Sequence, residues 1–123
     1  MHTNPSVSLI ELINILNTYR FRYASEKDLQ DGIEEALQTN GIDYLREASI
    51  SAANRPDFLV GGIVIEVKIK GSLPALLRQI SRYVEHDDVE SILVIGTPRW
   101  IPSVPKALSG KEIGSLRLIG SLL

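Results

Sequence analysis

The stretch that decides the fold is Arg55-Pro-Asp-Phe-Leu-Val-Gly-Gly-Ile-Val-Ile-Glu-Val-Lys-Ile-Lys70. Its β-branched and aromatic residues favour strands, and Gly61-Gly62 is typical of a two-residue hairpin turn. Counting outward from that turn predicts these pairs: Val60 with Ile63, Leu59 with Val64, Phe58 with Ile65, and Asp57 with Glu66. Two carboxylates are therefore expected to face each other across the hairpin.

Side chains alternate between the two faces of a strand, so the hairpin has one apolar face and one charged face. The apolar face is predicted to be core and contains Phe58, Val60, Ile63, Ile65, Val67 and Ile69. The opposite face carries Asp57, Glu66, Lys68 and Lys70. Like charges opposite each other destabilise a sheet unless a cation lies between them. Oxygen ligands without Cys or paired His indicate Mg²⁺ or Mn²⁺ as that cation.

Composition limits the class of protein. The chain has 123 residues, 44% hydrophobic and 23% charged, which is typical of one soluble globular domain. It has no cysteine, which excludes thiol chemistry and Cys-ligated metals and favours a cytoplasmic location. The longest apolar run, Leu59 to Ile65, is too short to span a membrane. No phosphate-binding loop of the ATPase type is present, so no nucleotide cofactor is expected.

The rest of the chain alternates between helical and extended patterns. Ser8 and Ser25 each begin an N-terminal capping pattern, and Ser72 precedes a proline in the first turn of a third helix. The predicted elements are helices at 9–19, 26–40 and 73–85; strands at 42–50, 55–70 and 91–96; a loop at 97–105; and a helix or edge strand at 116–123.

Pro56-Asp57, followed after eight residues by Glu66-Val67-Lys68, resembles the signature of the PD-(D/E)xK nuclease superfamily. The resemblance implies a restriction-endonuclease-like α/β fold with an αβββαβ core, in which helices flank a mixed central sheet. That core would be residues 25–96, preceded by a helical extension at 1–24 and followed by a loop and last element at 97–123. The segment that begins at Ser25 also resembles the equivalent helix start in small phage or prophage nucleases and in archaeal-type Holliday-junction resolvases.

The resemblance assigns roles to residues of the hairpin. Asp57, Glu66 and the carbonyl of Val67 would bind the metal, and Lys68 would assist the attacking water. Many members add an acidic residue from the preceding helix. On a helix with 100° per residue, Glu26 shares the side of Ile33, so we expect Glu26 to take that role. The alternative is that Glu26 only stabilises the helix N-terminus.

Gln79 and Tyr83 are four residues apart on the third predicted helix, and they resemble the QxxxY motif of RecB and lambda-exonuclease-type nucleases. The resemblance implies contact with the active site or the DNA. The alternatives are a backbone contact for Gln79 and ordinary core packing for Tyr83. Phosphate contacts would fall to Lys70, Arg78 and Arg82, although surface arginines, Arg46 included, are solvated by default.

Two further residues have competing interpretations. Glu47 is near enough in the chain to approach the metal, but a surface ion pair with its neighbour Arg46 is favoured. Trp100 could stack on a base, or it could serve packing or a subunit contact.

The function expected from these patterns is a Mg²⁺-dependent or Mn²⁺-dependent DNA nuclease that acts on ends or branches and not on a long base sequence. So small a domain is expected to build its DNA surface with a second copy, most simply as a dimer. The net charge of −2 argues for a local basic patch and keeps a silent DNA-binding or protein-binding module as an alternative. A structural oligomer built on the apolar segment 116–123 is the other alternative.

Overall fold

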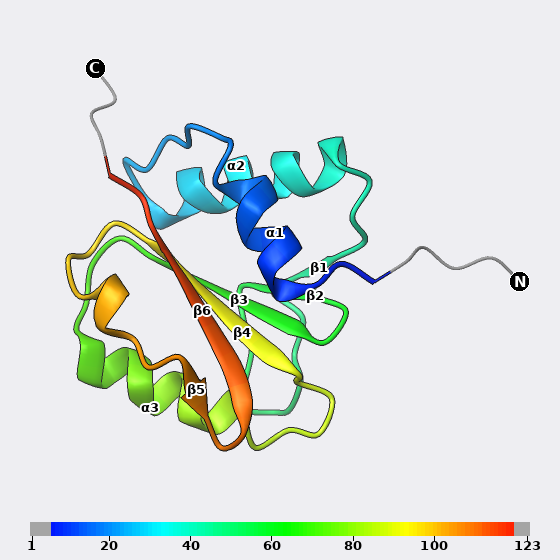
Figure 1. Ribbon diagram of the computed structural model, residues 1–123, viewed down its shortest axis with the longest axis vertical. Helices are drawn as coiled ribbons and strands as arrows, with labels where there is room; N and C mark the ends of the chain where they lie inside the picture. Colours follow the sequence, from blue (N-terminus) through cyan, green and yellow to red (C-terminus); the bar gives the residue numbers. More distant parts are fainter. Residues whose placement is uncertain (1–5, 120–123) are drawn as a thin grey trace, which may run out of the picture.

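A mixed six-stranded sheet forms the centre of the molecule in the computed structural model, which describes residues 6–119 (Figure 1). Its order is β1-β2-β3-β4-β6-β5. The central strands β3, β4 and β6 run parallel, and every other neighbouring pair is antiparallel. The strands are β1 (Leu45–Arg46), β2 (Phe58–Val60), β3 (Ile63–Lys68), β4 (Ser91–Gly96), β5 (Ala107–Leu108) and β6 (Lys111–Arg117).

Helices cover both faces of this sheet (Figure 1). On one face lie α1 and α2, and on the other lies α3 together with the short 3₁₀ helix η1. Each α-helix begins after a serine whose hydroxyl accepts a hydrogen bond from the third backbone N–H beyond it, as the capping patterns predict. The helices are α1 (Leu9–Leu16), α2 (Glu26–Thr39), α3 (Leu73–Tyr83) and η1 (Ile101–Ser103).

The hairpin register is confirmed. Gly61 adopts φ +57° in the turn, a conformation that favours glycine, and Phe58 pairs with Ile65. The predicted apolar face is also confirmed, because Ile63, Ile65 and Val67 belong to the buried cluster beneath α1 and α2. The chain is therefore held in a register in which Asp57 adjoins Glu66.

The other face of the sheet is not a solvated surface, because α3 covers it. Leu76, Ile80 and Tyr83 pack there against Val64 in a second buried cluster. Glu66 shares this face and is only 1% exposed. The strand pattern alone placed Glu66 on a charged face, but the apolar stripe of α3 converts that face into a second core.

Several predicted boundaries are wrong. The first helix ends at Leu16 and not at Tyr19, and the strand expected over 42–50 is reduced to Leu45–Arg46. The two strands at 107–108 and 111–117 were not predicted. Their residues are largely polar or half-exposed, so they lack the apolar run by which β4 is recognised. Of the element expected at 116–123, residues 120–123 lie outside the described part.

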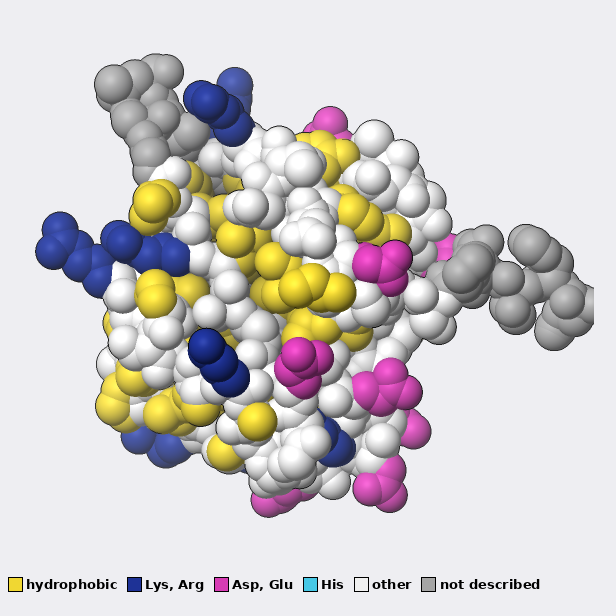
Figure 2. Space-filling model, viewed as in Figure 1, with side chains coloured by type: hydrophobic (Ala, Val, Ile, Leu, Met, Phe, Trp, Pro, Cys, Tyr) yellow, Lys and Arg dark blue, Asp and Glu magenta, His cyan; other side chains and the backbone are white. Residues whose placement is uncertain are grey.

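Apolar side chains also reach the surface in the middle of the face shown in Figure 2. Ile10 of α1 is 66% exposed. Carboxylates surround much of the right side of that view, and Lys and Arg side chains extend toward the left. Across residues 6–119, none of the helices has the length and apolar character needed to cross a membrane.

Candidate active site

The hairpin brings Asp57 and Glu66 together at the end of the sheet remote from the turn. The backbone N–H of Asp57 donates to Oε1 of Glu66 at 3.2 Å. In the opposite direction, the backbone N–H of Val67 donates to Oδ2 of Asp57 at 2.7 Å. Each carboxylate is thus fixed by the backbone of the other strand.

Burial makes this pair of carboxylates electrostatically unfavourable. It raises the pKa of Glu66 to about 8, with the nearby negative charge of Asp57 as the second cause. Burial also raises the pKa of Asp57. At neutral pH the pair therefore tends to retain a proton unless a cation compensates for it.

Lys68 is the closest cation to Glu66 in the described structure. Its Nζ lies 3.9 Å from Oε2 of Glu66, and it lowers the pKa of both carboxyls without cancelling the effect of burial. The alternation of β3 puts Lys68 two residues after Glu66 on the same face. Its ammonium group is only partly exposed and is available to a molecule that reaches Glu66.

Gln79 and Tyr83 contact the site from α3. The Tyr83 hydroxyl donates to Oε1 of Glu66 at 3.0 Å, and Nε2 of Gln79 donates to the Tyr83 hydroxyl at 3.1 Å. Tyr83 is at the same time a core residue, because it is only 2% exposed. Its burial and the adjacent Glu66 raise the pKa of the phenol, so it remains a donor at physiological pH.

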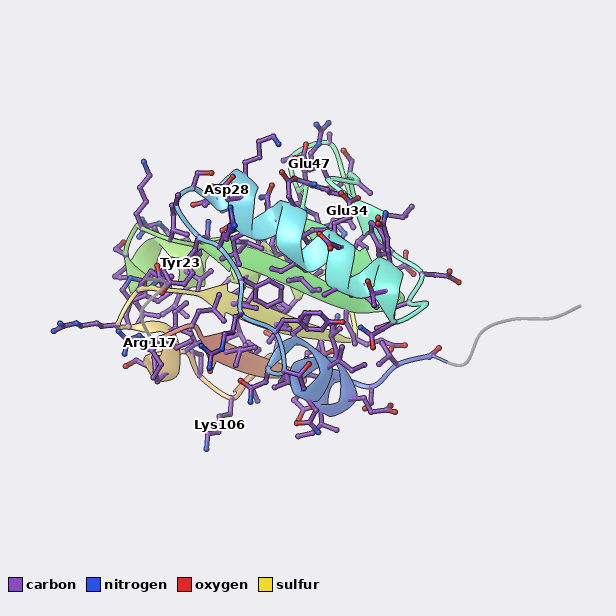
Figure 3. All side chains as sticks on the ribbon, turned by 90° about the horizontal axis from the view of Figure 1, so that it is seen from above. Tyr23, Asp28, Glu34, Glu47, Lys106 and Arg117 are labelled. Carbon is purple, nitrogen blue, oxygen red and sulfur yellow. The ribbon has the colours of Figure 1, made fainter. Side chains whose placement is uncertain are left out.

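The negative charges of Glu26 and Glu47 both raise the pKa of Asp57. Glu26 is the first residue of α2, and Glu47 donates its backbone N–H to the carbonyl of Asp57 at 2.9 Å. The ion pair expected between Glu47 and Arg46 is wrong. Figure 3 shows Glu47 on the same side of the molecule as Glu34, far from Lys106.

Arg46 is not a solvated residue. Its Nη1 forms ion pairs with Asp31 at 2.8 Å and Glu34 at 2.9 Å, both on α2. Its guanidinium also lies over the ring of Phe58, 5.8 Å from the centroid. The sequence interpretation missed this cluster because partners on two separate elements cannot be recognised from chain order.

Gln30 is the residue that sequence reasoning did not identify. It is 9% exposed, its Nε2 donates to Oδ1 of Asp57 at 3.1 Å, and its Oε1 accepts from Nη2 of Arg46 at 3.1 Å. A signal was present in the sequence. Gln30 is a polar residue between Leu29 and Ile33, on the face by which α2 packs against the sheet.

The donor set fits a hard divalent cation that retains water. Within residues 6–119, no group of three His, Asp or Glu side chains lies close enough to hold a metal ion. Mg²⁺, however, is commonly held by one or two carboxylates and completes its coordination with water. Asp57 and Glu66 supply those carboxylates. The role expected for the Val67 carbonyl stays a prediction.

A basic pocket of about 200 Å³ opens beside Lys68. Lys70, Arg82 and Gln79 line it together with Trp100, whose Nε1 donates to the carbonyl of Gly71 at 3.0 Å. Its described lining contains no carboxylate. The pocket therefore favours an anion next to the carboxylate pair.

The two arginines of α3 differ in their surroundings. Arg82 is exposed, but its Nε donates to Oδ1 of Asn54 at 3.2 Å. Arg78 is exposed, and its carbonyl accepts a hydrogen bond from Arg82. Only Arg82 reaches the basic pocket.

Comparison with protein-family models, curated proteins and solved structures finds no match for this chain. The functional interpretation therefore depends on the geometry of the site.

Proposed function

We propose that this protein is a metal-dependent DNA nuclease with a restriction-endonuclease-like core. The observation that carries the proposal is the pair of facing acids, half-buried Asp57 and buried Glu66, with Lys68 beside it. Burial raises the pKa of both acids, and Asp57 raises that of Glu66 further. Such acids are costly to stability, and they are typical of sites that receive a cation or a proton. The element order α2-β1-β2-β3-α3-β4 also agrees with the αβββαβ core of that family.

Mg²⁺ or Mn²⁺ would be held by Asp57 and Glu66, where it would polarise a phosphodiester and lower the pKa of a bound water. The oxygens of both residues are already oriented by backbone N–H groups, so little reorganisation is needed. Glu26, whose negative charge raises the pKa of Asp57, would assist through water.

The remaining residues orient the reactants. Lys68 offers a donor to the attacking water and a positive charge to the phosphate as negative charge develops on it. Tyr83 holds Oε1 of Glu66, and Gln79 in turn holds the Tyr83 hydroxyl. This chain of hydrogen bonds fixes Glu66 with its Oε2 toward Lys68.

The basic pocket supplies the affinity for DNA that the net charge of −2 does not. Lys70 and Arg82, which line this pocket, would contact phosphates next to the cleaved bond, and the exposed Arg78 would add a contact outside the pocket. A pocket this small suits recognition of DNA shape, ends or branches, with a second copy of the chain completing the binding surface.

The test is cleavage of labelled linear duplex, single-stranded and four-way-junction DNA in Mg²⁺, in Mn²⁺ and in EDTA. Lys68→Met is purified beside wild type, with Lys106→Met as the matched control. Lys106 is exposed and lies on the opposite side of the molecule from Glu47, which adjoins Asp57 (Figure 3). We expect wild type and Lys106→Met to cut with metal, and Lys68→Met to show no cleavage while it retains its fold.

Two outcomes would overturn the proposal. If wild type binds DNA but cuts none of the substrates in either metal, the protein is the DNA-binding module that the net charge keeps open. If Lys68→Met cuts as well as wild type, the cleavage comes from another site or a contaminant. The preferred substrate among those cut separates an end-directed enzyme from a junction resolvase.

A further inference from the structure

Gln30 joins two parts of the molecule that the hairpin motif does not connect. It lies on the first half of α2, while Asp57 precedes β2 and Arg46 ends β1. Its amide nitrogen contacts Oδ1 of Asp57 at 3.1 Å, and its amide oxygen contacts Nη2 of Arg46 at 3.1 Å. One buried side chain thus links the carboxylate site to the Arg46 cluster.

The surroundings permit only one orientation of that amide. If it were reversed, the Gln30 NH₂ group would face the guanidinium of Arg46, and its carbonyl would face the carboxylate of Asp57. Both contacts would be repulsive, because a guanidinium only donates and an ionised carboxylate only accepts. Arginine keeps its charge throughout the physiological pH range, so this selection does not depend on pH.

Arg46 is itself held firmly enough to impose this orientation. Asp31 and Glu34 bind its Nη1, and the ring of Phe58 lies beneath the guanidinium. The Nη2 group is then directed at Oε1 of Gln30. The acidic residues of α2 thus contact Arg46, Arg46 contacts Gln30, and Gln30 contacts Asp57.

We propose that Gln30 is a positioning residue of the site, and that Arg46 sets the orientation in which Gln30 donates to Asp57. This inference rests on the proposed nuclease function for its consequence in catalysis. The structural part of the inference, that Gln30 orients the Asp57 carboxylate, does not depend on that function.

The consequence for Asp57 is a carboxylate fixed at both oxygens. Gln30 holds Oδ1, and the backbone N–H of Val67 holds Oδ2 at 2.7 Å. Each oxygen retains a lone pair, and the carboxylate cannot rotate without losing both bonds. Without Gln30, only the bond from Val67 would remain to define that plane.

Three variants test the proposal. Gln30→Met keeps the length of the side chain and removes both bonds, whereas Gln30→Glu keeps the contact with Arg46 and sets a carboxylate oxygen against Asp57 in place of the donor. Gln38→Met is the matched control, because Gln38 is an exposed glutamine of the same helix that donates to Tyr44 at 2.8 Å. If Gln30 only supports Arg46, Gln30→Glu should behave like wild type.

The first readout needs neither metal nor DNA. In ¹H–¹⁵N spectra of the metal-free protein, the Val67 amide reports on the carboxylate to which it donates. We expect this resonance to move in both Gln30 variants more than the amides of α3 do, and to stay in place in Gln38→Met. If it is unmoved in Gln30→Glu, the proposal is overturned, because Gln30 then serves Arg46 alone.

The second readout is Mn²⁺ affinity and steady-state cleavage of the wild-type substrate. Loss of a group that orients a metal-binding carboxylate typically costs about 10-fold to 100-fold in affinity or activity. We expect Gln30→Met to lose affinity in that range, and both Gln30 variants to lose kcat in that range with KM unchanged. Arg46→Met should reproduce part of the loss, and the double variant should lose less than the sum of the two.

The outcomes separate the two proposals. If wild type neither binds metal nor cuts, the nuclease proposal fails, while the Val67 resonance still decides whether Gln30 holds Asp57. If wild type cuts and Gln30→Met cuts with an unchanged kcat, the positioning role is wrong. Additive losses in the double variant would show that Arg46 does not act through Gln30.

Discussion

Two pairs of acidic side chains lie on either side of Gln30, and they differ in what compensates their charge. Asp31 and Glu34 share the guanidinium of Arg46. Among residues 6–119, the one cation that forms an ion pair with Asp57 or Glu66 is Lys68, whose Nζ lies 3.9 Å from Oε2 of Glu66. The pKa of Glu34 is lowered, first by the Tyr44 hydrogen bond and then by Arg46, whereas the pKa of Glu66 is raised to about 8.

In this fold a guanidinium compensates the acidic pair on α2, whereas none does so for the pair at the hairpin among the described residues. A guanidinium at Asp57 and Glu66 would stabilise the protein in the way that Arg46 stabilises α2 against β1. Buried acids without such a partner reduce stability, and proteins commonly accept that cost at functional sites. The pair at the hairpin is therefore the better candidate for chemistry, and the pair on α2 the better candidate for structure.

The largest expected difference is in cleavage. Asp57→Asn and Glu66→Gln should each reduce the rate of DNA cleavage by about a thousandfold or more, since in the proposed mechanism each carboxylate would hold the metal. Asp31→Asn should stay within a few-fold of wild type, because Glu34 continues to hold Arg46. Single-turnover rates in Mg²⁺ at saturating protein measure all three variants.

These carboxamides nearly match the carboxylates in shape, so circular dichroism should give the same spectrum for every variant. The comparison fails if Asp31→Asn is as inactive as Asp57→Asn. It also fails if Asp57→Asn retains cleavage, because the metal would then be held elsewhere.

The next largest effect is on stability, measured by urea unfolding in EDTA from pH 4 to pH 9. The folded pKa of Glu66, about 8, is above its unfolded value of 4.5, so ionisation favours the unfolded chain. Wild type should lose stability as the pH rises from 4.5 to 8, by at most roughly 4 to 5 kcal/mol. Glu66→Gln should not show this loss, and its advantage over wild type should grow through the same interval.

Added Mg²⁺ sharpens this prediction. A ligand that binds only the folded state stabilises it, so wild type should gain stability from Mg²⁺ at pH 8, while Glu66→Gln should gain much less. Equal slopes of stability against pH in the two proteins would mean that Glu66 ionises normally and that the two acidic pairs do not differ.

A smaller effect is expected from the hydroxyl of Tyr83. Tyr83→Phe removes a donor to Glu66 and should cost about 1 to 2 kcal/mol at pH 9, where Glu66 is charged. Because this hydrogen bond lowers the pKa of Glu66, its loss should steepen the decline in stability with pH. Urea unfolding over the same pH range measures this difference in stability between Tyr83→Phe and wild type.

Tyr19→Phe is the control for that experiment, because the Tyr19 hydroxyl is a partner of Asn40 and not of a carboxylate. Its effect should be the same at pH 5 and pH 9. If Tyr83→Phe is likewise independent of pH, Tyr83 serves only as a core residue.

The hairpin and its acids could be predicted because they depend on local geometry. A two-residue turn fixes the register, and the register decides which residue faces Glu66. The spacing of Gln79 and Tyr83 places them on one side of a helix for the same reason. These inferences need only the periods of strands and helices.

The residues that escaped prediction depend on contacts between distant segments. Arg46 finds Asp31 and Glu34 because β1 lies at the edge of the sheet beside α2, which no local pattern specifies. Gln30 was missed because its function arises from two partners on different elements. Strand β6 was not predicted for two reasons. Its own sequence is only partly apolar, and its partner β4 lies about twenty residues earlier in the chain.

The smallest expected effect comes from Glu34→Gln in the compensated pair. The folded pKa of Glu34 is below its unfolded value, so its ionised form stabilises the protein above the unfolded pKa, and this contribution is lost as the pH falls through the folded pKa. Its side chain is 30% exposed, so solvent screening limits the cost of Glu34→Gln at pH 7 to less than about 1 kcal/mol. The difference from wild type should shrink as the pH falls through the folded pKa and should decrease in high salt. This direction is the opposite of that for Glu66→Gln, which becomes more stable relative to wild type as the pH rises. If urea unfolding instead shows that both substitutions stabilise the protein at pH 7, then Arg46 does not compensate Glu34, and the two acidic pairs are equivalent.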